Sequence, residues 1–165
     1  MKKFFLVLLL VLPLSTFAQK FGHFNSADII QQMPEYKEAQ TELQKLQTQY
    51  ETDLKTMQDE LKRKATDYEA AHDSLPENIR ARREQELQEL SNRIQQTFND
   101  NQQALQQKSN EKMNAIAEKV KTTVKAIGDA GGYVYIMDLT AGIPYISSTL
   151  SKDLTAEVKA KLGLK

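Results

Sequence analysis

Residues 61–90 read LKRKATDYEAAHDSLPENIRARREQELQEL, and this stretch decides the fold. Leu, Ala, Glu, Gln, Lys and Arg dominate both of its halves, and these residue types favour helix. Pro76 interrupts the pattern, because proline lacks a backbone N–H and keeps Leu75 away from helical angles. We expect a turn here, with Asp73 or Ser74 capping a second helix that carries Pro76 in its first turn. The stretch therefore predicts two helices that fold back on each other.

The helical composition extends outward from this turn to Pro34 on one side and Ile127 on the other, without a single glycine. Before the turn, apolar residues recur at alternating spacings of three and four, with extra spacings of four near Tyr50 and Ala65. Such a repeat is typical of a coiled coil whose supercoil is locally unwound. The middle of the second helix is diluted by glutamine.

If the two helices fold back about the turn, they meet along a contact that we call the seam. A residue of the first helix then faces a residue of the second whose number brings the sum of the two to about 150. Leu61 then lies opposite Leu90, and Leu54 lies near Phe98. The second helix is expected to end at Gly128, which makes it longer than the first by about a dozen residues. This excess must pack against something else, and we expect a base built from the two ends of the chain.

The base is predicted from short patterns near both termini. Its elements are, in order, a strand at 20–25, a brief helix capped by Ser26, strands at 133–137 and 143–146, and a final helix, capped by Asp153 or Thr155, that ends near Leu162. Pro144 marks the strand at 143–146 as an edge or a strand start.

The strand at 133–137, YVYIM, is apolar on both faces and therefore needs cover on both. One copy of the base has only about fifty residues, and domains this small often associate when they lack disulfides and metals. We expect the base to oligomerise through six apolar residues: Phe21, Phe24, Val134, Ile136, Ile143 and Tyr145.

The predicted fold class is therefore mostly α, a long coiled-coil hairpin on a small α/β base that forms an oligomeric β-body. Three parts are expected along the chain. They are a signal peptide at 1–18, a helical hairpin arm at 34–127 with its tip near 73–77, and an oligomerisation body made of 19–33 together with 128–165.

The signal peptide is predicted from Lys2 and Lys3, an apolar run that follows them, and small residues at Thr16 and Ala18. The apolar run is too short to span a membrane, and cleavage is expected after Ala18. An uncleaved N-terminal anchor is the alternative. Without the two lysines, 20 basic and 22 acidic residues remain, a net charge of −2. This balance does not favour nucleic acid as a partner.

The residues that most enzymes need are missing or dispersed. The chain has no cysteine, so disulfides and thiolate chemistry are excluded. His23 and His72 are far apart in the sequence, with no metal-ligand spacing beside either. The glycines form no phosphate-binding loop. We therefore predict no enzyme activity, no cofactor and no metal.

Shape is then the remaining basis for function, since several arms on an oligomeric base would surround a common space. Soft or amphipathic arm side chains suit loose contact with a client, and the candidates are Tyr50, Met57, Tyr68, Phe98 and Met113. The alternative is that these residues are ordinary coiled-coil core. A basic cluster near the tip could contact anionic clients or membrane lipid: Lys62, Arg63, Lys64, Arg80, Arg82 and Arg83. Acidic residues stand among them, so a mixed soluble surface is the other interpretation.

The order of these parts resembles the Skp (OmpH) family of periplasmic chaperones. The most specific segments are Phe24-Asn25-Ser26, Gln32-Met33-Pro34-Glu35-Tyr36, Tyr133-Val134-Tyr135-Ile136-Met137-Asp138 and Asp153-Leu154-Thr155-Ala156-Glu157-Val158. The resemblance implies a periplasmic homotrimer whose hairpins act as tentacles around a cavity. Its function would be that of an ATP-independent holdase that binds unfolded outer-membrane proteins and prevents their aggregation. A structural or tethering coiled-coil protein of the cell envelope is the alternative.

Overall fold

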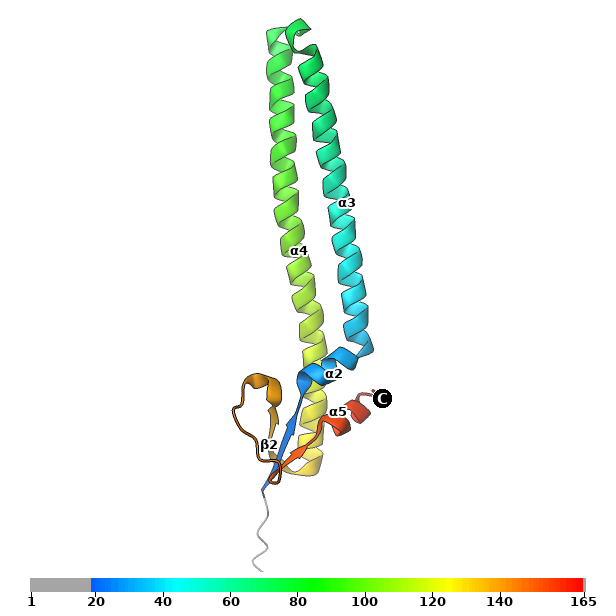
Figure 1. The fold of residues 1–165 in the computed structure, drawn as a ribbon, viewed down its shortest axis with the longest axis vertical. Coiled ribbons are helices and arrows are strands. Elements are labelled where there is room, and N and C mark those ends of the chain that lie inside the picture. The colour runs from blue at the N-terminus through cyan, green and yellow to red at the C-terminus, as the bar shows by residue number, and fades with distance from the viewer. Residues whose placement is uncertain (1–18, 165) are drawn as a thin grey trace, which may run out of the picture.

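The computed structural model describes residues 19–164, so the predicted signal peptide at 1–18 lies outside the described residues. Two long helices, α3 and α4, stand side by side above a small base (Figure 1). The predicted fold class, a long helical hairpin on a small mixed base, is confirmed. The elements in chain order are β1 (Lys20–Phe24), α2 (Ser26–Gln32), α3 (Pro34–Ala71), a 3-10 turn (His72–Ser74), α4 (Glu77–Gly131), β2 (Tyr133–Asp138), a 3-10 turn (Leu139–Ala141), β3 (Ser151–Asp153) and α5 (Thr155–Lys161).

The hairpin begins where Met33 leaves helical angles between α2 and α3, with φ −68° and ψ 131°. Pro34 then occupies the first position of α3, where its missing N–H costs nothing. At the tip, Leu75 is extended and α4 starts at Glu77. Neither Asp73 nor Ser74 caps α4 as expected, since Pro76 is the cap residue and no side chain bonds there. The Ser74 hydroxyl instead donates to the Ala71 carbonyl at 2.7 Å.

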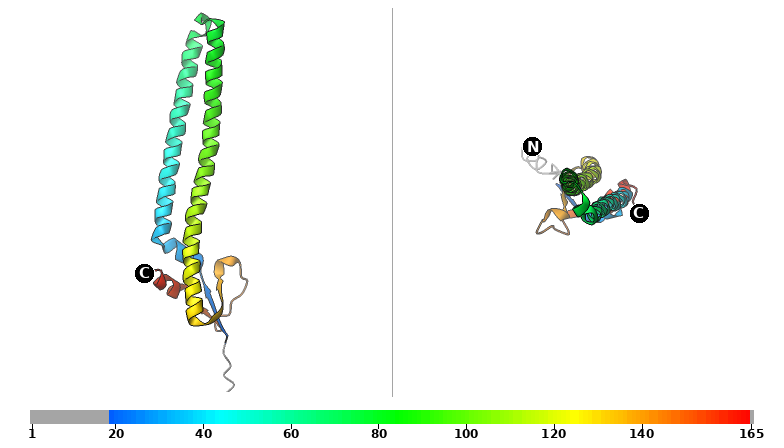
Figure 2. Two further views of the ribbon diagram at one scale, coloured as in Figure 1. Left: turned by 180° about the vertical axis from the view of Figure 1, so that it is seen from behind. Right: turned by 90° about the horizontal axis from the view of Figure 1, so that it is seen from above.

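The sheet of the base has the strand order β2-β1-β3, and both outer strands run parallel to β1. This arrangement places β1, near the first described residue, between two strands from the C-terminal part of the chain, as seen from both sides of the molecule (Figures 1 and 2). Gly22 of β1 allows close packing, since a Cβ there would lie 2.6 Å from Leu154 Cδ1. The core lies beside the sheet, between α2, α5 and the lower part of α4. Its fully buried side chains are Ile29, Met33, Leu154 and Val158.

The prediction of a strand at 143–146 is wrong. The third strand is β3, and the segment before it is a loop that starts at Gly142, whose φ is +72°. Pro144 has no N–H to donate to a sheet, which disfavours strand pairing there. β3 consists of three polar residues and is held by its register with β1, where the Leu154 N–H donates to the His23 carbonyl at 2.8 Å.

Two predicted helix ends also differ from the structure. α4 continues past Gly128 to Gly131, and the left-handed residue that ends it is Gly132, with φ +66°. Gly128 serves packing instead, because a Cβ there would lie 3.2 Å from Ile136 Cδ1 on β2. At α2 the cap is Asn25 rather than Ser26, since the Asn25 side chain accepts a hydrogen bond from the Asp28 N–H at 3.1 Å.

Candidate functional site

One face of the sheet carries an apolar surface that no residue from 19 to 164 covers. Side chains alternate along a strand, so Gly22 and Phe24 face the core while Phe21 lies on the opposite side. The rings of Phe21 and Tyr135 stack there with centroids 6.4 Å apart. Together with Ile146 and Leu150 of the loop, they line a groove of about 290 Å³. We call the surface formed by Phe21, Tyr135, Met137, Ile146 and Leu150 the sheet face.

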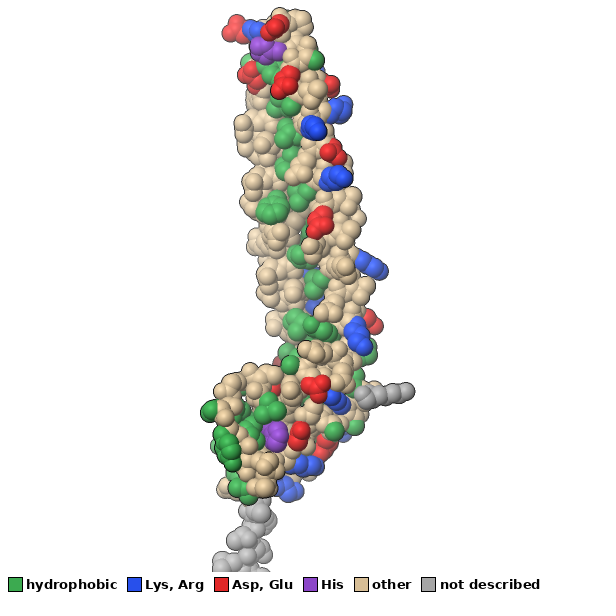
Figure 3. Space-filling model, viewed as in Figure 1, with side chains coloured by type: hydrophobic (Ala, Val, Ile, Leu, Met, Phe, Trp, Pro, Cys, Tyr) green, Lys and Arg blue, Asp and Glu red, His purple; other side chains and the backbone are tan. Residues whose placement is uncertain are grey.

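The sheet face is strongly exposed: Tyr135 is 59% accessible and Leu150 is 76% accessible. β2 is also an edge strand, with β1 on one side only. Hydrophobic side chains gather on the part of the base that carries β2 and the following loop (Figure 3). Residues 133–137 were expected to need cover on both faces. The described residues of a single copy do not provide this cover, because Val134, Tyr135 and Met137 are all exposed.

The six residues predicted for the oligomerisation body divide into two groups. Phe24 is buried in the chain's own core, and Ile136 packs against that core. Phe21 and Ile143 are half-buried, whereas Val134 and Tyr145 are exposed, Tyr145 at 79%. The prediction missed Met137 and Leu150 on the same face. Met137 could have been found from its place in the apolar strand, but Leu150 follows the polar run 147–149 and belongs to no strand pattern.

Two ion pairs join α3 and α4 at the end of the hairpin next to the base. We call this part, residues 35–42 of α3 and 112–119 of α4, the foot. Lys112 of α4 contacts Glu42 of α3 at 2.5 Å, and Lys119 of α4 contacts Glu35. The ammonium groups donate hydrogen bonds that hold the pKa of both carboxyls below the usual range. Buried Ala39 and Ile116 are part of the same core, so this foot is the best-packed part of the arm.

A pH prediction follows for Glu42. Its carboxylate form is favoured in the folded chain, so its stabilising effect is full above the ordinary carboxyl pKa of about 4.5 and is lost as the pH falls through the lowered value. We expect Glu42→Gln to lower Tm slightly at neutral pH and to have a smaller effect at about pH 3, because protonation removes part of the interaction in the wild type. Circular dichroism melts at both pH values check this. Glu69→Gln, an exposed change far from the foot, is the control, and an equal effect of Glu42→Gln at both pH values would contradict the assignment.

Beyond the foot, the arm seam is only half-buried. The structure describes every residue from 40 to 115, and none of their side chains is fully buried. Among the predicted client-contact residues, Tyr50, Met57 and Tyr68 are half-buried like the rest of the seam, and Met113 packs against the core. Phe98 differs, because it is 45% exposed, and it is the one arm residue among the large exposed hydrophobic side chains of the described chain.

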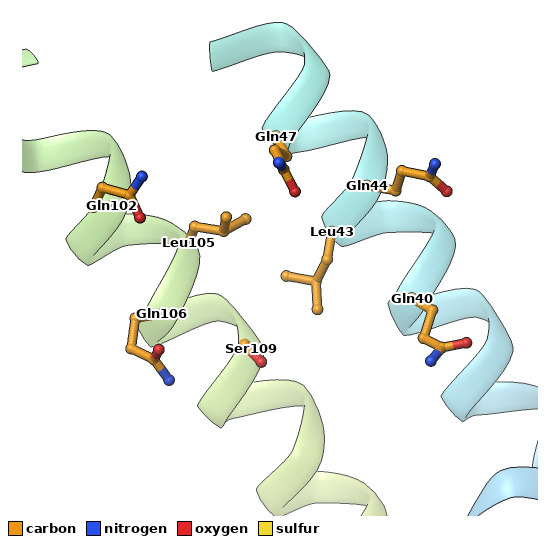
Figure 4. A pocket seen from close by; sticks show the side chains of 8 residues that line it. All are labelled: Gln40, Leu43, Gln44, Gln47, Gln102, Leu105, Gln106 and Ser109. Atoms are coloured by element: carbon orange, nitrogen blue, oxygen red, sulfur yellow. The ribbon is translucent and has the colours of Figure 1, made fainter. Parts of the chain in front are cut away.

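The seam is open where glutamines outnumber apolar residues, between residues 40–47 of α3 and 102–109 of α4. The open cavity there measures about 530 Å³, and Leu43 and Leu105 point toward one another across it (Figure 4). We call this cavity the seam gap. Its other lining residues are Gln40, Gln44, Gln47, Gln102, Gln106 and Ser109. Sequence reasoning noted the glutamines but did not predict a cavity.

The basic residues at the tip stand among acidic partners. Lys64 pairs with Glu60 at 3.6 Å, and Arg82 and Arg83 each lie 3.5 Å from Glu86. The Tyr68 hydroxyl donates to the Glu84 carboxylate, and this hydrogen bond raises the tyrosine pKa. Three residues of the predicted cluster, Arg63, Lys64 and Arg83, line one small cavity.

Two kinds of feature are absent from residues 19–164. In this range no helix has the length and apolar character required to cross a bilayer. No three His, Cys, Asp or Glu side chains gather there in a way that could hold a metal ion.

Comparison with known proteins identifies a family and a similar solved structure. A family model described as "Outer membrane protein (OmpH-like)" matches residues 20–162. A crystal structure from Caulobacter crescentus CB15, described as a candidate outer membrane chaperone (OmpH-like), superposes with a TM-score of 0.74 at 16% identity, covering 87% of this chain and 83% of its own. This structural likeness supports the fold. No curated protein matches the chain.

Proposed function

Because the chain belongs to the OmpH-like family of outer membrane proteins, we propose that it is an ATP-independent holdase chaperone. Its clients are unfolded outer-membrane proteins, which it binds between hairpin arms and keeps from aggregating. The similar Caulobacter protein is described as a candidate outer membrane chaperone, which supports this role. The activity consists of binding alone, without nucleotide, cofactor or catalysis.

The observation that carries the proposal is the uncovered sheet face. Water contact with Tyr135, Met137 and Leu150 is unfavourable by about 25 cal/mol for each Å² of apolar area, so their burial between copies stabilises an assembly. The free edge of β2 offers unpaired backbone groups to a neighbouring copy. We propose a homotrimer in which the bases associate through 19–33 and 128–165.

The arms then project from a common body. The 38 residues of α3 rise about 57 Å at 1.5 Å each. Three such hairpins surround a space into which half-buried seam residues and Phe98 present apolar surface. Contact of this soft and incomplete kind suits clients that share no single sequence.

The proposed compartment is the periplasm. Residues 1–18 act as a signal peptide that is cleaved after Ala18, and the mature chain starts at Gln19. Peripheral contact of the tip with membrane lipid belongs to the same proposal, through the basic residues around Arg63 and Arg83.

Two measurements on the mature protein test the proposal. Native mass is expected to equal three chains and to rise by one client when an unfolded β-barrel membrane protein is added. Light scattering is expected to show that the protein suppresses aggregation of that client without ATP. An intact trimer that leaves aggregation unchanged would end the holdase proposal, and a stable monomer at working concentration would end the cage.

Phe98 offers a specific prediction. Because its side chain is 45% exposed, Phe98→Ser should lower the free energy of unfolding by only about 1–2 kcal/mol and leave the chain folded. We expect the same variant to suppress aggregation less efficiently, so that more protein is needed for half-maximal protection. Gln96→Ser, two residues away and also exposed, is the matched control. Equal protection by both variants would show that Phe98 does not contact clients.

A further inference from the structure

We propose that the seam gap is a binding site for a short extended segment of polypeptide in which apolar and polar residues alternate. Strands of outer-membrane β-barrels have this pattern, so the inference rests on the proposed function and names a capture site within each arm. The site is distinct from the space between arms, because both of its walls belong to one hairpin.

The dimensions of the seam gap fit such a segment. From Gln40 to Gln47 the wall of α3 rises about 10 Å, which equals about three residues of extended chain. Its volume of about 530 Å³ lies within the usual range of ligand pockets. On the side of the base it is bounded by the Glu42–Lys112 ion pair and by buried Ile116. A short stretch of chain can therefore enter, but a folded element cannot.

The lining supplies both kinds of contact that an extended chain needs. Leu43 and Leu105 face each other and can hold one apolar side chain between them (Figure 4). Gln47 and Ser109 lie on either side of this leucine pair in the same view. The eight lining residues include no charged side chain, so the site selects neither acidic nor basic segments.

Hydrogen bonds along each helix occupy only part of the capacity of the lining amides. The side-chain N–H groups of Gln40, Gln47 and Gln106 donate to Tyr36, Glu51 and Asn110 at 3.0, 2.8 and 3.0 Å. Each of these amides has a second N–H and a carbonyl oxygen, so the three glutamines can both donate to and accept from a bound chain. The backbone N–H and C=O groups of an unfolded client are hydrogen-bonded to water, and they can exchange that water for the amides of the lining. The donor and acceptor pattern of the seam gap therefore complements an unfolded backbone.

Filling the seam gap tests the proposal. In mature protein, Gln47→Leu with Ser109→Leu places apolar groups beside Leu43 and Leu105, which should close the seam and raise Tm. The control, Gln103→Leu with Ser91→Leu, makes the same changes at exposed positions of α4 outside the cavity. The probe is a fluorescein-labelled ten-residue peptide that alternates valine and serine, and an alternating glycine and serine peptide is the negative ligand. Binding is measured by fluorescence anisotropy.

We expect the filled variant to bind the valine peptide about tenfold more weakly than wild type, and the control variant to bind it equally well. Wild-type affinity in the filled variant would overturn the capture site, while the proposed function would stand if aggregation suppression persists. Failure of the wild-type protein to suppress aggregation would instead overturn the proposed function.

A second measurement applies if the filled variant does not fold. The chain has no cysteine, so Ser109→Cys carries a single benzophenone label inside the seam gap. Irradiation is expected to cross-link it to the valine peptide far more than the same label at Gln103→Cys. Equal cross-linking at the two positions would overturn the capture site.

Discussion

Replacing Tyr135 with glutamate is expected to convert the proposed trimer into folded monomers. Tyr135 is 59% exposed in one copy and stacks only on Phe21, so the single chain tolerates the change. In the assembly, however, the new carboxylate would be buried against apolar side chains, and an unpaired buried charge costs several kcal/mol. Sedimentation should show about one third of the wild-type mass, and aggregation suppression should be largely lost.

Gln103→Glu is the control for this result, since it adds the same charge at an exposed arm position. Circular dichroism should show wild-type helix content in both variants. A Tyr135→Glu protein that keeps the full mass would mean that copies associate through another surface, and the sheet face would then need a different explanation.

The hairpin was predictable because its signals are local. Helix-favouring residues, a repeat of three and four, and one proline specify two long helices and their turn. The register was close as well: Tyr68 contacts Glu84, and Glu42 contacts Lys112, so paired numbers sum to 152 and 154 rather than 150. Leu43 and Leu105, which face each other, sum to 148, so the contacts scatter around the predicted value.

The base was harder to predict because its pairings join distant parts of the chain. β1 pairs with strands more than 100 residues away, and β3 has three polar residues with no periodic pattern. Gly128 looked like a helix end, although its role is to let Ile136 approach α4. Such roles depend on what packs against a residue, which no local pattern contains.

The candidate surfaces were predictable only where a local sequence pattern indicated them. The apolar strand at 133–137 was sufficient to predict an exposed face, although Leu150 and the loop around it were not part of that prediction. The seam gap was not predicted at all. Glutamines in a helical repeat indicate a weakened seam, but whether the helices close over them or stay apart depends on how the foot holds both helices.

Truncation of Leu154 to alanine is expected to destabilise the base more than any change in the arms. Leu154 is fully buried, packs over Gly22, and joins β1 through its backbone N–H. Removal of its side chain leaves a cavity, and comparable changes cost about 2–5 kcal/mol. Leu139→Ala is the control, because Leu139 is 39% exposed in the same base and should cost much less. Urea unfolding of both variants measures the difference.

Hydrogen exchange extends this prediction to the arms. Side chains from 40 to 115 are at most half-buried, so their helices are held mainly by local hydrogen bonds and the seam. A loss of 2 kcal/mol corresponds to about 30-fold faster exchange, and we expect this increase for Leu154→Ala at amides of β1, α5 and the lower part of α4. Amides at 54–61 and 87–94 should keep their wild-type rates. Equal acceleration there would mean that base and arms open together as one cooperative unit.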